Sequence, residues 1–346
     1  MTGAAPARAE PLRLVWYDTE LGRDGPGLLL RDIAGGDDAQ TQAVAQVIAA
    51  LAPDVLVLAG VDADAEGRTL AALNATLAAP YPHLFSALPN AGLPTGLDLD
   101  GNGRQGEARD AQGYGRFTGA GGLAVLSRWP LGTGADHSAL LWRALPDSLI
   151  AADDPGHGVQ RLSSMAHWVL PVETPQGPLH LGIFRATPPV FDGPEDRNGR
   201  RNHDELRFWR LLLDGALPPG APLAGPGGGA AAGPEGLPAP FVILGGGNLD
   251  PERGAGRRAA IRELLADPRV QDPAPRWQSA DPAEGDTTVD WPAEGPGRMR
   301  VDYVLPSAGI RVVGAGVYWP QPSDPMGEAV ARASRHRPVW VDLRLE

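Results

Sequence analysis

Short apolar runs that are rich in β-forming residues recur along this chain of 346 residues and constrain its fold more than any other feature. Residues 12–21 alternate in polarity like a strand, and a second apolar strand is predicted from Val55. Apolar residues at helical spacing predict a helix between them, beginning near Asp37 or Asp38. Both strands end in acidic residues, so the chain opens as strand, helix and strand with carboxylates at the strand ends.

The remainder of the chain adds both hairpins and crossovers. Residues 121–131 predict a buried strand, and the stretch that follows Met165 predicts a hairpin with its turn at 174–177. Further helices are predicted around 198–217 and 257–265. Because strands outnumber helices and hairpins are mixed with crossovers, a mixed-sheet α/β sandwich fits better than a purely parallel fold.

Length alone does not decide between one large domain and two small ones, and a single domain covering residues 1–346 is the better prediction for the following reason. A Gly/Ala/Pro-rich stretch at 218–240 resembles a linker in composition, but the strands after it have too little chain to form a core of their own. We therefore expect this stretch to be a disordered surface insertion within a single domain.

Composition limits the partners and the compartment. The formal net charge of −12 repels polyanions, so long nucleic acids are disfavoured, whereas a small phosphate-containing molecule or another anion remains possible. No apolar run approaches the roughly 20 residues that a membrane helix needs, so no membrane association is expected. The opening residues lack a signal-peptide core, which predicts a cytoplasmic protein as the chain stands, with secretion still open if a signal was removed. The absence of cysteine excludes disulfides and thiolate metal sites.

The stretch FVILGGGNLDP, residues 241–251, ends a predicted strand in three glycines beside Asn248. A phosphate-binding loop of the Walker type needs GxxxxGK[ST], and a dinucleotide fingerprint needs GxGxxG at the start of a helix. Neither pattern is present. The stretch is therefore a turn or a catalytic strand end rather than a nucleotide cradle.

The order of these motifs resembles the endonuclease/exonuclease/phosphatase superfamily, which has the DNase I-like fold. The resemblance rests on GLDLDGNGR, DAQGYGRF, LAVLSRWP, TPPVFDGPEDRNGRRNHDE, RVDYVLPS and HRPVWVDL, which occur here in this order. It implies a four-layer α/β/β/α sandwich with two mixed β-sheets whose strand ends meet at one pocket. It also implies Mg²⁺-dependent hydrolysis of phosphoesters, with carboxylates for the metal, a histidine oriented by an aspartate, and an asparagine that positions water or phosphate.

Three positions match the catalytic motifs of that superfamily. Asn248 keeps the asparagine of the GDxN motif, Asp302 matches the aspartate that orients the histidine, and His336 matches the histidine of the final SDH motif. The resemblance assigns these three residues to the catalytic set.

Four other positions depart from the pattern. Gly60 stands where the second strand carries the main metal-binding glutamate, and Gly246 replaces the aspartate of GDxN. Arg185 replaces a histidine in an HPTPP-like context, and Arg335 replaces the aspartate of SDH. Since Mg²⁺ is held by few carboxylates, these changes predict that the metal-dependent activity is impaired or lost and that a binding or regulatory role replaces it.

Two hypotheses concern what the altered site still does. Asp18, Glu20 and Asp62 could act as substitute metal ligands in a working Mg²⁺-dependent phosphodiesterase or phosphatase, because position 62 repeats the strand face of position 60. Alternatively, Arg185 and Arg335 could bind a phosphate or carboxylate without a metal. The simpler interpretation of these arginines is that each pairs with a nearby acid such as Asp18 or Glu20 and fills space.

A separate loop has the spacing of a calcium site. Asp98, Asp100 and Asn102 occupy positions 1, 3 and 5 of an EF-hand-like loop with Gly103 at position 6, but Arg109 occupies the place of the closing acid. A peripheral Ca²⁺ site and a polar turn both remain open from the sequence.

Overall fold

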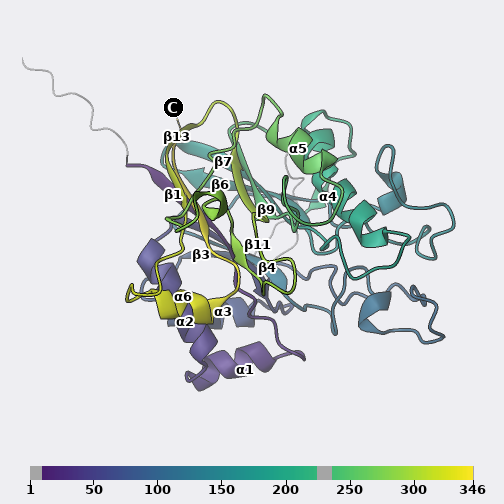
Figure 1. The fold of residues 1–346 in the computed structure, drawn as a ribbon, viewed down its shortest axis with the longest axis horizontal. Coiled ribbons are helices and arrows are strands. Elements are labelled where there is room, and N and C mark those ends of the chain that lie inside the picture. Colours follow the sequence, from purple (N-terminus) through teal and green to yellow (C-terminus); the bar gives the residue numbers. More distant parts are fainter. Residues whose placement is uncertain (1–9, 224–235, 346) are drawn as a thin grey trace, which may run out of the picture.

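A computed structural model describes residues 10–223 and 236–345. Two six-stranded mixed sheets pack face to face, and helices cover the outer face of each (Figure 1). This arrangement is the four-layer α/β/β/α sandwich that the sequence predicts.

The first sheet contains the amino- and carboxyl-terminal strands side by side. Its strands in spatial order are β13 (Arg311–Val317), β14 (Val339–Arg344), β1 (Leu12–Asp18), β2 (Val55–Val61), β4 (Gly122–Ser127) and β3 (His83–Ser86). β1 runs parallel to β2 and antiparallel to β14, so the sheet is mixed.

The second sheet is built around the predicted hairpin. Its strands in spatial order are β12 (Asp302–Pro306), β9 (Phe241–Gly246), β7 (Gly177–Arg185), β6 (His167–Thr174), β5 (Ala135–Asp136) and β8 (Ala221–Pro222). β7 pairs antiparallel with β6 and parallel with β9. A separate two-stranded ribbon joins β10 (Val289–Asp290) and β11 (Arg298–Met299).

Apolar alternation along the strands creates three packed layers of core. The inner faces of both sheets meet in a core that includes Trp16, Val57, Leu181 and Val304. The outer face of the first sheet packs against α1 (Leu28–Gly35), α2 (Ala39–Leu51), α3 (Arg68–Thr76) and α6 (Gly327–Ala333). The outer face of the second sheet packs against α4 (Arg197–Leu213) and α5 (Ala259–Leu265), which Figure 1 shows on the opposite side of the molecule.

Local signals in the sequence explain several boundaries. α2 begins where the carboxylate of Asp38 accepts a hydrogen bond from the backbone N–H of Thr41 at 2.7 Å, as expected for a helix N-cap. The hairpin turn falls at 174–177, as predicted. Within the Gly/Ala/Pro-rich stretch at 218–240, residues 221–222 form β8. Residues 224–235 of this stretch lie outside the described residues, so the expected disorder remains a prediction there.

Candidate functional site

Strand ends from both sheets converge at one edge of the sandwich. β1 ends at Asp18 and the parallel β2 ends close by, while His336 lies just before β14. In the second sheet, Asp302 at the start of β12 pairs with Gly246 at the end of β9, and Gly246 also pairs with Arg185 at the end of β7. Because parallel strands end at the same edge and antiparallel strands begin there, the topology gathers these positions into one site.

A buried ion pair joins the two sheets at this edge. Arg185 Nε lies 2.7 Å from Asp18 Oδ2, and the Asp18 side chain is only 1% exposed. Burial raises the pKa of Asp18, but the positive charges of Arg185 and His336 outweigh it and leave this pKa below its ordinary value. Asp18 is therefore held as a carboxylate by Arg185, the arginine that the sequence resemblance places at a histidine position.

A second ion pair lies toward the solvent. Glu20 accepts hydrogen bonds from the backbone N–H of Arg335 at 2.9 Å and from Arg335 Nε at 3.0 Å, and Arg335 Nη2 also contacts it. Burial raises the pKa of Glu20, but the hydrogen bond from Arg335 and the charge of His336 outweigh burial and leave this pKa below its ordinary value. Both arginines thus pair with the acids that the simpler sequence interpretation names.

Gly60 has a backbone that excludes a larger residue. Its φ is +73°, and the pairing register between β2 and β4 shifts between Ala59 and Val61. A Cβ atom at position 60 would lie 2.7 Å from the backbone nitrogen of Glu20 and 2.9 Å from Asp18 Oδ1. The position at which the family pattern carries its metal-binding glutamate therefore accommodates glycine alone without rearrangement.

Gly246 differs from Gly60 in this respect. A Cβ atom at Gly246 would meet Arg185 Cγ and a ring carbon of Trp16 at 3.4 Å, which is ordinary van der Waals contact. The backbone at position 246 can therefore accept a side chain, while the backbone at position 60 cannot. The two glycines that the resemblance places at metal-ligand positions therefore differ in the space around them.

Asp302 and His336 form a buried pair. His336 Nδ1 lies 2.8 Å from Asp302 Oδ2, and the carboxylate also accepts hydrogen bonds from Trp16 Nε1 at 2.8 Å and from the Thr288 hydroxyl at 2.9 Å. Burial lowers the pKa of His336, but the negative charges of Asp302 and Asp18 raise it to about 9. The Trp291 ring lies edge-on to His336 with 5.7 Å between ring centroids. At neutral pH this histidine is therefore a cation.

Asn248 has a different kind of contact. Its backbone is left-handed at φ 50°, and its Nδ2 donates to the backbone carbonyl of Ala186 at 2.7 Å. The side chain is buried and ties the loop after β9 to the loop after β7. The structure thus places Asn248 beside Arg185 and uses its amide N–H to join two strand ends.

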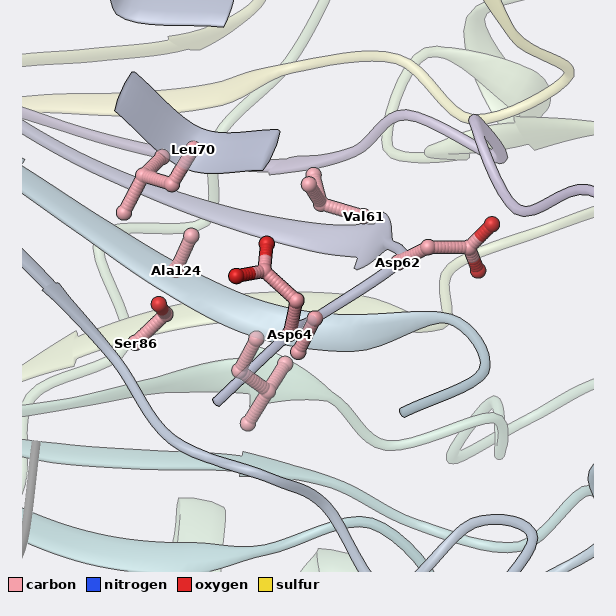
Figure 2. Close-up of a pocket in the computed structure, with 8 residues that line it drawn as sticks. Val61, Asp62, Asp64, Leu70, Ser86 and Ala124 are labelled. Atoms are coloured by element: carbon pink, nitrogen blue, oxygen red, sulfur yellow. The ribbon is translucent and has the colours of Figure 1, made fainter. Parts of the chain in front are cut away.

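Asp62 does not join Asp18 and Glu20. Its carboxylate accepts hydrogen bonds from the backbone N–H groups of Arg23 and Gly121, both at 2.9 Å. Figure 2 shows the side chains of Asp62 and Asp64 pointing in different directions beyond the end of β2. In the described parts of the chain, Asp18, Glu20 and Asp62 do not bring three ligand oxygens within 4.8 Å of one another. The shift in register at Gly60 breaks the simple two-residue alternation on which this substitute ligand set was predicted.

The predicted calcium loop is ordered largely by its own hydrogen bonds. Asp98 accepts from the backbone N–H groups of Gly101 and Gly103 at 2.8 and 2.7 Å. The oxygens of Asp98 and Asp100 come within 4.8 Å of each other and of Asp110, a residue that the sequence spacing did not indicate. Asn102 instead directs its Nδ2 at the carboxylates of Asp100 and Glu107. Neither the Nδ2 amide group of Asn102 nor the guanidinium of Arg109 can serve as a further calcium ligand. Arg109 Nη1 lies 4.0 Å from Asp100 Oδ2.

A buried polar network beneath the site was not predicted from the sequence. Asn202 of α4 donates from Nδ2 to the backbone carbonyls of Thr187 at 2.7 Å and Gly247 at 2.8 Å. Arg201, which is 4% exposed, donates to the backbone carbonyls of residues 112, 161, 162 and 163, and Glu205 accepts from Ser164 and Thr187. The polar run RRNHDE within an amphipathic helix was the available signal, since polar residues on a core-facing helix need partners.

The two packed mixed sheets, with helices on both outer faces and strand ends that meet at one edge, define the class of the protein as an α/β/β/α sandwich. A family model of the Endonuclease/Exonuclease/phosphatase family matches residues 32–336, and the chain belongs to this family.

Solved structures show the same fold at low sequence identity. An endonuclease/exonuclease/phosphatase from Beutenbergia cavernae DSM 12333 is 20% identical with a TM-score of 0.57, over 97% of this chain and 72% of that chain. An endonuclease/exonuclease/phosphatase family protein from Leptotrichia buccalis C-1013-b is 13% identical with a TM-score of 0.51, over 96% of this chain and 99% of that chain. No curated protein gave a significant match. Among the described residues, no helix combines the length and apolar character needed to cross a membrane.

Proposed function

We propose that this chain binds a small phosphate-bearing molecule at the strand-end site and does not hydrolyse it. The observation that carries the proposal is the backbone at Gly60. The left-handed φ and the contacts with Glu20 and Asp18 leave no room for the side chain that would hold the metal. The lineage supplies phosphoesters as the ligand class, and the site supplies donors for them.

The side chains at the site do not fit a Mg²⁺ ion. Mg²⁺ requires nearly octahedral oxygen coordination, usually with one or two carboxylates. Asp18 is taken by Arg185, Glu20 by Arg335, and Asp62 by two backbone N–H groups away from both. Fixed guanidinium charges at these carboxylates oppose a divalent cation. No step of the proposed function therefore involves the metal.

His336 is also unsuited to activate water as a base. Its pKa of about 9 keeps it protonated at neutral pH, with Nδ1 bonded to Asp302. A general base must be deprotonated at the operating pH to accept a proton. His336 can instead donate a hydrogen bond from Nε2, because none of the described residues accepts one from this atom.

The remaining donors suit a phosphate group. Arg185 uses Nε for Asp18, and none of the described residues accepts a hydrogen bond from its two Nη atoms. Arg335 adds a guanidinium that is 59% exposed. Planar guanidinium groups bind phosphate oxygens through paired, charge-assisted hydrogen bonds. The overall charge of −12 favours a small phosphate-bearing molecule over a long nucleic acid, because it repels an extended polyanion.

Two measurements test this function. Calorimetric titration with inorganic phosphate and with a nucleoside monophosphate should detect binding in the presence of EDTA, and Arg185→Gln should abolish it. Arg31→Gln, which removes an arginine 70% exposed on α1, is the matched control and should bind like the wild type. Failure of phosphate and nucleotide to bind would contradict the binding role.

Hydrolysis is tested on the same preparation. A generic phosphodiester incubated with Mg²⁺ or Mn²⁺ should remain intact at the rate of the uncatalysed reaction. Turnover that EDTA abolishes would overturn the proposal and support a working phosphodiesterase with Asp18, Glu20 and Asp62 as substitute ligands. Calorimetry with Mg²⁺ provides an independent check, and we expect no binding at the strand-end site.

A further inference from the structure

The carboxylate of Glu20 lies in a cradle of hydrogen-bond donors, which we call the Ser334–Arg335 cradle. The cradle consists of the Ser334 hydroxyl, the backbone N–H of Arg335 and the Arg335 guanidinium. Glu20 Oε2 lies 2.9 Å from the backbone nitrogen of Arg335 and 3.2 Å from Ser334 Oγ. Glu20 Oε1 lies 3.0 Å from Arg335 Nε and also contacts Nη2. The backbone N–H and the guanidinium are the main donors to the two oxygens, while the hydroxyl shares its one hydrogen with the closer backbone carbonyl of Asp18. A backbone N–H beside a guanidinium suits any compact oxyanion.

Glu20 reaches this cradle through an unusual backbone conformation. Its φ is 50°, a left-handed value that is costly for a residue with a side chain. Its nitrogen and Cα lie 2.7 and 3.0 Å from where a Cβ of residue 60 would stand. Glycine at position 60 therefore provides the space in which the Glu20 backbone places its carboxylate against Arg335.

The contact between Glu20 and the cradle is exchangeable. The Arg335 side chain is 59% exposed, and exposed ion pairs of this kind contribute little net stability. The Ser334 hydroxyl has a closer acceptor in the backbone carbonyl of Asp18 at 2.8 Å. Glu20 can therefore leave without stranding a buried donor, since Arg335 is accessible to water.

The charges around the cradle favour a phosphate once Glu20 has left. The cations Arg185, His336 and Arg335 then face the anions Asp18 and Asp302, which leaves one net positive charge. Arg337, which contacts the Ser334 carbonyl, is balanced by Asp290 at 3.7 Å and does not change this sum. A phosphate group offers more acceptor oxygens and more charge than a carboxylate. The site thus becomes locally attractive to anions although the whole chain is acidic.

We propose that Glu20 is a built-in competitor for the ligand: the phosphate group of the bound molecule takes the place of the Glu20 carboxylate on the Ser334–Arg335 cradle. This inference rests on the proposed function and adds the subsite and its regulation. The strand-end site is held closed by its own side chain, and any partner or condition that withdraws Glu20 opens it.

The test compares the affinity for inorganic phosphate of matched variants by calorimetry. Glu20→Gln keeps the shape of the side chain and removes its charge, so it should bind phosphate at least tenfold more tightly than the wild type. Glu328→Gln is the control, because Glu328 pairs with Arg332 in a similar exposed contact on α6, and it should match the wild type. Adding Arg335→Gln to Glu20→Gln should remove the gain.

Thermal unfolding establishes that each variant is folded. If Glu20→Gln does not fold, Glu20→Asp provides the same test, since its carboxylate is one methylene too short to reach the cradle and phosphate binding should again tighten. Unchanged or weaker phosphate binding by a folded Glu20 variant would overturn the competitor role. If the wild type binds phosphate and Glu20→Gln binds equally well, the proposed function stands and the competitor role fails. If the wild type does not bind phosphate and Glu20→Gln does, the competitor role stands, and the proposed binding by the wild-type chain on its own fails. If neither protein binds phosphate, the proposed function and the competitor role both fail.

Discussion

Two buried polar clusters of this molecule provide partners for their buried charged and polar side chains in different ways. At the strand-end site, charged side chains pair with one another: Arg185 with Asp18, and His336 with Asp302. Beneath the second sheet, the α4 cluster of Arg201, Asn202 and Glu205 directs its charges and amides mainly at the backbone and at Ser164.

The difference indicates which cluster can take part in binding. A side chain that holds a backbone carbonyl cannot leave without stranding a buried polar group, whereas a charged side chain can exchange one charged partner for another. We therefore interpret the α4 cluster as the support that fixes the loops after β7 and β9, and the strand-end cluster as the part that can accept a ligand.

The largest expected loss of stability follows a substitution in the α4 cluster. Arg201→Met should lower the free energy of unfolding by about 3–5 kcal/mol, because it removes a donor from four backbone carbonyls and the positive charge near Glu205. Two of these carbonyls, at residues 112 and 163, keep a second side-chain donor. Urea unfolding followed by circular dichroism measures this loss. Arg207→Met on the same helix, where the arginine pairs with the exposed Asp147, is the control and should cost less than about 1 kcal/mol. Equal losses would remove the distinction between the clusters.

A second prediction concerns the backbone that shapes the strand-end site. Gly60→Ala should cost about 2–4 kcal/mol, since it combines a left-handed φ with a Cβ 2.7 Å from the Glu20 nitrogen. Gly27→Ala has nearly the same φ, +74°, and no atom within 4 Å of the added Cβ, so it should show the cost of the backbone conformation alone. Thermal unfolding of both variants separates the two contributions. A Gly60 variant as stable as the Gly27 variant would mean that position 60 can accept a larger residue.

The two clusters should respond in opposite directions to pH. Burial lowers the pKa of His336, but the negative charges of Asp302 and Asp18 raise it to about 9, so the stabilising contribution of this histidine is complete below about pH 6.5 and is lost as pH rises through 9. Burial lowers the pKa of His167, which contacts the Glu205 carbonyl, to about 3, so its effect is a loss of stability as pH falls from 6.5 toward 3. The alkaline window should amount to about 3 kcal/mol and the full acidic window to about 5 kcal/mol, because one pKa unit corresponds to about 1.4 kcal/mol.

Urea unfolding at intervals from pH 4 to pH 9.5 measures both windows. His336→Asn should flatten the alkaline side of the profile, and His167→Asn should flatten the acidic side. An alkaline slope that persists in His336→Asn would assign the titration to another group.

The smallest effect is expected at the outer ion pair of the strand-end site. Arg335→Gln should change the free energy of unfolding by less than about 1 kcal/mol, because the pair with Glu20 is largely exposed on the arginine side. Arg332→Gln, which breaks an exposed pair with Glu328, should behave alike. A loss of several kcal/mol at Arg335 alone would show that the pair is structural, and its exchange for a phosphate would then be too costly.

The architecture could be predicted from the sequence because the patterns that specify each helix and strand lie within the element itself. Alternating and helical apolar patterns, the acid at the start of α2 and the turn at 174–177 each fix an element from its own residues. The family motifs then placed Asn248, Asp302 and His336 at one edge. The pairing of Arg185 with Asp18 and of Arg335 with Glu20 was one of two alternatives that charge alone allowed.

What the sequence could not supply depends on contacts between distant residues. The shift in register that turns position 60 left-handed arises from the packing of β2 against β4 and Glu20, so strand alternation wrongly suggested that Asp62 would approach Asp18. The carbonyl partners of Arg201 come from segments 38 to 89 residues away. Asp110 joins Asp98 and Asp100 from outside the calcium-loop spacing for the same reason.

The placement of tryptophan at the strand-end site gives the molecule an optical signal of its own. Trp16 donates its indole N–H to Asp302, and the Trp291 ring meets the edge of His336. Protonated imidazole quenches indole fluorescence, so emission should brighten as His336 loses its proton and should change again when an anion displaces Glu20 nearby. Occupancy of the site could then be followed in the unlabelled protein, with Trp291→Phe identifying the ring that reports it.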